Sequence, residues 1–161
     1  MARSGSFGVN YKKSYGTDPA VVEHKLGDLG SDTDGEWVFV KASASVAQYA
    51  FVAIAKDNTV AELTTTTAGS NSLQVGVAQV ALATNEYGWV WIGGPMGGGV
   101  GKGIKGKIAA SYVAEANLNT TATAGVADDA STTLIKNVVA VALTTGATSV
   151  ELKSQGYLSV N

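Results

Sequence analysis

The chain contains no cysteine and a single histidine, His24, among 161 residues. Without cysteine, neither a disulfide framework nor a thiolate metal site can form, so stability must come from packing and association. One histidine also excludes a metal site built from a histidine cluster. We therefore expect no metal site and no cofactor.

Charge is scarce as well: charged residues make up 15% of the chain, and 11 basic against 13 acidic residues give a net charge of −2. This balance lacks the basic excess that binding to a phosphate backbone requires, so nucleic acid is not expected as a partner. The longest apolar run, residues 138–143, is too short to span a bilayer, and the first residues show no apolar signal segment. We expect a soluble intracellular product with no membrane partner, and the low charge favours a homo-oligomer or a larger assembly.

The residue patterns of common hydrolases are missing. No G-x-S-x-G motif is present and no cysteine is available, so His24 has no nucleophile to activate. Asp128 and Asp129 lie in a polar loop without an identified partner, and we interpret them as turn residues. The sequence offers no catalytic residues, and we do not expect an enzyme.

Glycine is concentrated in the stretch GGPMGGGVGKG, residues 93–103. A phosphate-binding Walker loop would need glycine where this chain has Met96, and serine or threonine where it has Gly103. Residues 101–106 match G-x-G-x-x-G, but that motif needs a helix to follow, and residues 104–112 alternate like a strand. The residues expected on one face of this strand are Ile104, Gly106, Ile108, Ala110 and Tyr112. We predict a flexible interface loop and no bound nucleotide.

Strand patterns dominate from residue 35 onward. After an expected turn at Asp34-Gly35, Trp37 and Phe39 alternate with Val38 and Val40, which predicts a strand buried on both sides. Similar patterns recur in residues 50–63, 73–82, 85–94 and 134–160, the last with a hairpin near residues 145–146. The fold class expected is mainly β, with a compact β-barrel or β-sandwich domain.

Two segments resemble each other. Residues 62–82 and 117–143 share a threonine-rich stretch, an Ala-Gly pair, a polar loop that is longer in the second copy, and a valine-alternating strand ending in Ala-Leu. This similarity predicts a duplicated strand-loop-strand unit within one barrel or sandwich.

The first 17 residues show neither a helical nor a strand period. We predict a flexible N-terminal arm over residues 1–17 that orders on a partner, followed by a single β domain over residues 18–161. At the boundary, Asp18 and Pro19 are typical of a helix start, and an extended approach to a hairpin is an equal alternative.

Aromatic and basic residues supply the candidates for contacts with a partner. Tyr87, Trp89 and Trp91 alternate along one strand, and we expect them to fill the barrel or a subunit interface; stacking platforms for sugars or bases are the alternative. Lysines near residues 102–107, together with basic residues of the arm, form either a basic patch for an acidic partner or a solvated face.

Three stretches resemble the small capsid decoration (cement) proteins of tailed bacteriophages. They lie between residues 35 and 143, and the most telling pieces are VGVAQ followed by YGWV, and TATAG followed by DD. The resemblance implies a compact β domain that associates as homotrimers and attaches to the major capsid protein on the outer face of the assembled virion, often with help from an N-terminal arm.

These observations lead us to expect a structural virion protein that stabilises a phage capsid. The alternative is a receptor- or carbohydrate-binding module of a phage tail or fibre, in which the aromatic rings would be exposed. The candidate interface residues are Arg3, Phe7, Tyr11, Lys12, Lys13, Tyr15, Trp89, Trp91, Met96 and Lys102.

Overall fold

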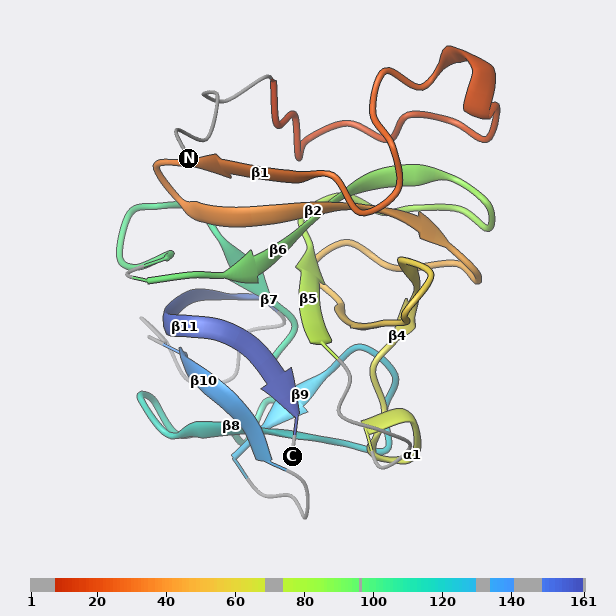
Figure 1. Ribbon diagram of the computed structural model, residues 1–161. Coiled ribbons are helices and arrows are strands. Elements are labelled where there is room, and N and C mark those ends of the chain that lie inside the picture. Colours follow the sequence, from red (N-terminus) through yellow and green to blue (C-terminus); the bar gives the residue numbers. More distant parts are fainter. Residues whose placement is uncertain (1–7, 69–73, 96, 130–133, 141–148, 161) are drawn as a thin grey trace.

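The computed structural model in Figure 1 describes residues 8–68, 74–95, 97–129, 134–140 and 149–160. Strands hold 43% of the chain and helices 5%, which confirms the mainly β class expected from the sequence. The strands are arranged as two small rings, one in the upper and one in the lower half of the view.

The first ring is a closed barrel of strands β2 (Gly35–Ala42), β4 (Thr59–Glu62), β3 (Phe51–Ile54), β5 (Gln74–Ala78) and β6 (Tyr87–Gly93). Each strand pairs with the next in this order, and β6 pairs with β2 to close the ring; only the β2–β4 pairing is parallel. Strand β1 (Leu29–Asp32) pairs with β2 as a hairpin. The hairpin turn lies at Thr33 and Asp34, one residue before the position expected from the sequence.

Every second side chain along each strand points into this barrel. Val38 and Val40 belong to an apolar cluster with members on all five strands, so this face of β2 points into the barrel. Trp37 and Phe39, on the opposite face, belong to a second apolar cluster outside it. All four side chains are buried, which confirms the prediction of a strand buried on both sides.

The second ring contains β7 (Lys105–Gly106), β9 (Ala127–Asp128), β8 (Asn117–Thr120), β10 (Leu134–Ala140) and β11 (Val150–Val160). Strand β11 pairs with β10 and β7, and β8 pairs with β10 and β9. A parallel bridge between Ile108, just after β7, and Ala127 of β9 closes the ring.

The two barrels repeat the same order of strand pairings and share the register at one or more positions of each antiparallel pairing, although β10 shifts register against β8 between Leu134 and Val139. The parallel β2–β4 contact corresponds to the parallel bridge of the second barrel, and each antiparallel pairing also has its counterpart. The equivalent pairs, first barrel then second, are Phe51–Val77 and Asn117–Val139, Val77–Trp91 and Val139–Lys153, Ile54–Val60 and Thr120–Ala127, and Phe39–Trp89 and Lys105–Glu151. A duplication is therefore present, but the expectation that both copies lie within one barrel or sandwich is wrong, because each copy belongs to a ring of its own.

The turn that precedes β3 is reproduced before β8. Tyr49 and Glu115 occupy equivalent positions and share a left-handed backbone, with φ of 65° and 63°. Side-chain carboxylates tie both turns down: Glu62 accepts a hydrogen bond from the Ala47 amide at 2.8 Å, and Asp129 accepts one from the Val113 amide at 3.2 Å.

The threonine-rich part of the predicted repeat does not match in space. The threonines of residues 64–67 lie in and beside the short helix α1 (Thr65–Ala68), whereas Thr120 lies in strand β8. The valine strands are equivalent, since they form β5 and β10. The polar stretch after the Ala-Gly pair is longer in the second copy because it contains strand β9, whereas the equivalent strand β4 precedes the threonines of the first copy.

Residues 104–112 follow the predicted alternation only in part. Ile104, Gly106 and Ile108 are buried on one face as expected. The chain then turns, with the Tyr112 amide donating to the Ala109 carbonyl at 3.1 Å, so Ala110 is exposed and the predicted strand ends early. Tyr112 still points inward, because the turn returns it to the core.

Backbone hydrogen bonds join the two barrels. The Phe51 amide donates to the Gly125 carbonyl at 3.0 Å, and the Lys107 amide donates to the Tyr49 carbonyl at 2.8 Å. The ring of Phe51 also approaches Gly106, where a Cβ atom would lie 2.9 Å from the ring. Glycine at this position leaves room for a side chain of the first barrel at the wall of the second.

Candidate partner-binding surface

The aromatic residues of the first barrel pack against one another on its outer face. Phe39 lies 5.2 Å from Trp89 and 6.1 Å from Tyr87, measured between ring centroids. Trp89 is 2% exposed, Trp91 is 0% exposed and Tyr87 is 9% exposed. The rings therefore fill the core of this chain, and Trp89 and Trp91 are wrong as candidates for surface contacts.

Residues 8–28 cover this aromatic face, in the upper part of Figure 1. Tyr11 stacks on Trp37 with a centroid distance of 4.3 Å and an interplanar angle of 6°. Tyr15 packs edge-on against Phe39 at 5.3 Å, and His24 lies 5.0 Å from Trp89. We refer to residues 8–28 as the N-terminal cover. It includes one turn of 3₁₀ helix, η1 (Pro19–Val21), capped by Asp18 as the sequence indicated.

The expectation of a flexible arm is wrong for residues 8–17. Two backbone hydrogen bonds hold this stretch to β6: the Tyr15 amide donates to the Tyr87 carbonyl at 2.8 Å, and the Tyr87 amide donates to the Gly16 carbonyl at 3.0 Å. Because aromatic rings rather than a continuous ladder make most of the contact, the sequence shows no period here. Residues 1–7, with the candidates Arg3 and Phe7, lie outside the described residues.

The buried indole nitrogens differ in whether they have a hydrogen-bond acceptor. Trp91 donates its Nε1 hydrogen to the Asp34 carbonyl at 3.0 Å. The Nε1 atoms of Trp37 and Trp89 are buried and have no acceptor within the described residues. An unsatisfied buried donor costs about 1–3 kcal/mol, so packing rather than polar contact holds these two rings in place.

The glycine-rich loop is attached to strand β11 over its described part, so the expectation of a flexible loop is wrong for residues 97–101. The Gly99 amide donates to the Leu152 carbonyl at 2.7 Å, and both carboxylate oxygens of Glu151 lie 3.2 Å from the Gly101 amide nitrogen. A Cβ atom on Gly98 would lie 2.1 Å from the Leu152 carbonyl oxygen, so the glycine permits close backbone approach. Met96 lies outside the described residues.

A pocket of about 260 Å³ opens where the N-terminal cover meets this loop. Four segments far apart in the sequence supply its lining, which consists of Tyr11, Lys12, Gln48, Tyr49, Gln79, Val80 and Gly103. We call it the lysine–tyrosine pocket, because the Lys12 ammonium lies 5.7 Å from the Tyr11 ring centroid and the Lys105 ammonium lies 5.9 Å from that of Tyr49.

Side-chain amides fix the wall of the lysine–tyrosine pocket. Gln79 Nε2 donates to the Lys105 carbonyl at 2.8 Å, and Gln79 Oε1 accepts from the Lys105 amide at 3.0 Å. Gln48 Nε2 donates to the Gln79 carbonyl at 3.1 Å. Neither glutamine was among the residues expected from the sequence, although Gln79 is a polar residue that continues the buried face of β5, two residues after the buried Val77.

The carboxylate of Asp34 interacts with residues at the lysine–tyrosine pocket. Burial, and then the neighbouring Asp32, raise the pKa of Asp34, while the hydrogen bond from Tyr11 and, after it, Lys102 and Lys12 oppose this rise. Burial also raises the pKa of Tyr11, whose hydroxyl lies 3.4 Å from Asp34 Oδ2. The structure thus brings the sequence candidates Tyr11, Lys12 and Lys102 into one neighbourhood.

The remaining basic and aromatic candidates lie elsewhere. The Lys13 ammonium lies 5.1 Å from the Tyr15 ring centroid, over the aromatic face and outside the lining of the lysine–tyrosine pocket. Of the basic patch considered from the sequence, the structure therefore gathers only some members.

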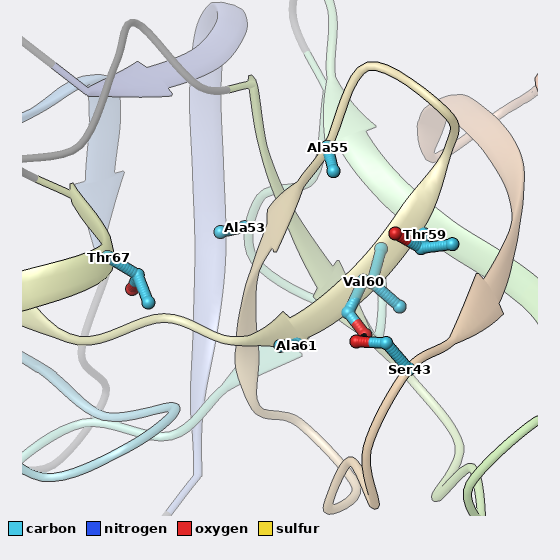
Figure 2. A pocket seen from close by; sticks show the side chains of 7 residues that line it. All are labelled: Ser43, Ala53, Ala55, Thr59, Val60, Ala61 and Thr67. Carbon is cyan, nitrogen blue, oxygen red and sulfur yellow. Dashed lines mark hydrogen bonds between the residues drawn. The ribbon is translucent and has the colours of Figure 1, made fainter.

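A second pocket, of about 190 Å³, is lined by small side chains (Figure 2). The hydroxyl of Ser43 donates to the Val60 carbonyl at 2.9 Å, and that of Thr59 donates to Asp57 at 2.7 Å. Since these hydroxyls already bind the chain itself, methyl groups make up most of the available surface. The pocket has room for an aliphatic group but offers no charged side chain to orient a ligand.

The interpretation of Asp128 as a solvated turn residue is wrong, because Asp128 lies in strand β9. Asp128 is buried and accepts hydrogen bonds from the Ser111 hydroxyl at 3.2 Å and from the Asp129 amide at 2.8 Å. No group of three or more potential metal ligands occurs among the described residues. In the same part of the chain, no helix has the length and apolar character needed to cross a membrane.

Comparison of the chain with protein-family models, curated proteins and solved structures gives no match.

Proposed function

We propose that this chain is a structural protein that binds the outer surface of an assembled phage capsid as a homotrimer and stabilises it, with no catalytic role. The observation that carries the proposal is where the resembling motifs lie. VGVAQ and YGWV fall on β5 and β6, which are neighbours in the first barrel, and the DD pair begins in β9 of the second. The resemblance therefore involves the strands that build the fold.

The described surface also suits association. Several large apolar side chains of the described residues are at least 40% exposed: Leu26, Leu29, Val100, Val113 and Tyr157. A protein that binds only the assembled shell stabilises it by mass action, by about 2.7 kcal/mol per site at a hundredfold excess over the dissociation constant. A trimer would engage several sites at once and bind more tightly than one chain.

The alternative of a carbohydrate-binding module loses its main support. That function required Tyr87, Trp89 and Trp91 as exposed platforms, and all three are buried beneath the N-terminal cover or in the core.

The direct test mixes the purified protein with undecorated capsids and measures saturable binding by sedimentation, after light scattering has given the mass of the free oligomer. We expect a trimer that saturates a fixed number of sites and raises the temperature at which the shell disrupts. A monomer that binds no viral shell would contradict the proposal.

A further inference from the structure

Strand β1 lies outside both rings and has a free edge (Figure 1). Within the described residues, β1 pairs with β2 alone, whereas the strands of the two rings have partners on both sides. Closing a sheet into a ring removes the edges at which a further strand can be added. The outer edge of β1 is therefore a place where the described sheet can gain a strand.

The hydrogen bonds of the hairpin show which backbone groups of β1 point outward. The Phe39 amide of β2 donates to the Asp28 carbonyl at 2.9 Å, and Gly30 lies two residues further along the same edge. Because successive residues of a strand direct their backbone groups to opposite edges, Gly30 faces β2, and Leu29 and Ser31 face away from it. The amides and carbonyls of these two residues have no hydrogen-bond partner within the described part of the chain.

The N-terminal cover packs on one face of β1 and leaves this edge open. Val9 occupies the space where a Cβ atom on Gly30 would lie, so the cover contacts the strand from the side of the aromatic rings. Leu29, on the opposite face, is 63% exposed, and Leu26 is 40% exposed. An added strand would pair with the outward backbone groups and cover the Leu29 side chain with its own.

A second copy of this chain fits the edge less well than a different polypeptide does. Two β1 edges use all their outward groups when Leu29 of one copy lies opposite Ser31 of the other, in an antiparallel pair with two-fold symmetry. In that register, Asp28 of each copy lies opposite Asp32 of the other, and like charges directly opposite each other are unfavourable. Two-fold pairing also gives a dimer and cannot close the homotrimer proposed above.

We propose that the outer edge of β1 accepts an extended segment of the major capsid protein as an added strand. This inference rests on the proposed function, which supplies the partner. The edge fits a strand that has free backbone groups and an apolar side chain opposite the exposed Leu29. The main-chain hydrogen bonds give such a contact its affinity, and the side-chain contact gives it specificity.

Amide hydrogen exchange of the full chain, free and bound to undecorated capsids, tests the inference directly. In the free protein, we expect the amides of Leu29 and Ser31 to exchange rapidly and the Gly30 amide, which faces β2, to be protected. On the capsid, exchange at Leu29 and Ser31 should slow by about tenfold or more. Protection of these two amides in the free protein would overturn the inference, because a second copy or the chain itself would then occupy the edge.

A proline at an outward-facing position blocks the edge while keeping the hairpin. Ser31→Pro removes one outward amide and leaves the hydrogen bonds between β1 and β2 in place. We expect its affinity for capsids to fall about tenfold or more, whereas the matched control Ser31→Ala, which keeps the amide, should lose less than about threefold. Retained protection of the Gly30 amide establishes that the hairpin is folded in each variant.

Leu29→Ala tests the apolar part of the contact. Because the added strand covers this side chain, we expect the variant to bind capsids about tenfold more weakly. Val113→Ala is the matched control, since Val113 is 59% exposed and precedes β8 in the second barrel. It should lose less than about threefold.

Three further results would overturn the inference: capsid binding by folded Ser31→Pro at the affinity of the parent, unchanged exchange at Leu29 and Ser31 on the capsid, or equal losses for Leu29→Ala and Val113→Ala. The inference and the proposed function fail in different ways. If the parent protein binds no capsid, the decoration function and the strand addition are both wrong. If the parent binds and Ser31→Pro binds equally well, only the strand addition is wrong.

Discussion

The stacked rings of Tyr11 and Trp37 should contribute measurably to the docking of the N-terminal cover, and Tyr11→Ala tests this. The Tyr11 ring lies parallel to that of Trp37 at 4.3 Å, and Trp37 is 0% exposed. Loss of an aromatic pair costs about 0.5–1.5 kcal/mol beyond burial. Uncovering one face of the indole exposes roughly 60 Å² of apolar surface, or about 1.5 kcal/mol at about 25 cal/mol per Å². We expect the variant to lose about 2–3 kcal/mol of unfolding free energy.

Urea unfolding followed by tryptophan fluorescence measures that loss, and acrylamide quenching reports whether an indole becomes accessible. Tyr11→Phe is the matched control, because it keeps the stacked ring and removes only a hydroxyl that lies 3.4 Å from Asp34. A bond of that length is weak, so the control should lose less than about 0.5 kcal/mol. If the alanine variant matches the phenylalanine variant in both stability and quenching, residues 8–17 are not docked as described.

Three further changes test other contacts. The pKa of Asp34 is raised by burial above its ordinary value of 3.8, so the folded state binds this proton more tightly and stability falls as pH rises through that range. Asp34→Asn should therefore gain stability over the parent at about pH 7 and show no gain at about pH 3, as urea midpoints at the two pH values would reveal. Gly106→Ala would place a Cβ atom 2.8 Å from Leu152 Cδ1 and 2.9 Å from the Phe51 ring, and such overpacking should cost about 1–3 kcal/mol in urea unfolding. Glu62→Ala and Asp129→Ala remove the acceptors of the two equivalent turns; each should cost about 0.5–1.5 kcal/mol, more for Glu62 with its shorter bond, and their effects should add.

Each of these tests has a clear contrary result. A gain for Asp34→Asn that persists at about pH 3 would mean that charge is not its cause. A neutral Gly106→Ala would mean that Phe51 and the second barrel are not in close contact. A coupling above about 0.5 kcal/mol between Glu62→Ala and Asp129→Ala would mean that the two turns are not independent.

The sequence predicted the parts of the fold that depend on alternation along a strand. In β2, one face carries the aromatic residues Trp37 and Phe39 and the other carries valines. This difference makes the two-residue period of a strand recognisable in the sequence. The same reasoning failed at Ala110, because a turn begins at Ala109. Alternation describes a strand only while the backbone stays extended.

Contacts between separate segments were not predictable in this way. The docking of Tyr11 on Trp37 depends on ring geometry, and neighbouring residues of the cover give no periodic pattern. The lysine–tyrosine pocket likewise joins residues from four segments, and only the fold places Tyr49 beside Lys105. Two kinds of sequence signal point to this site: the candidates Tyr11 and Lys12, and a polar residue at a buried position, Gln79.

Among the described residues, the N-terminal cover packs on the first barrel, and a comparison of equivalent positions in the two barrels gives the reason. Phe39 and Trp89 form a cross-strand pair on the outer face of the first barrel, and Lys105 and Glu151 form the equivalent pair in the second. An aromatic pair at this position must be shielded from water, and residues 8–28 shield it. A charged pair at the same position can face solvent and leaves its lysine beside the pocket. Two copies of one backbone pattern thus differ at the same surface position: one carries an aromatic pair that packs against the N-terminal cover, and the other carries a partly exposed charged pair.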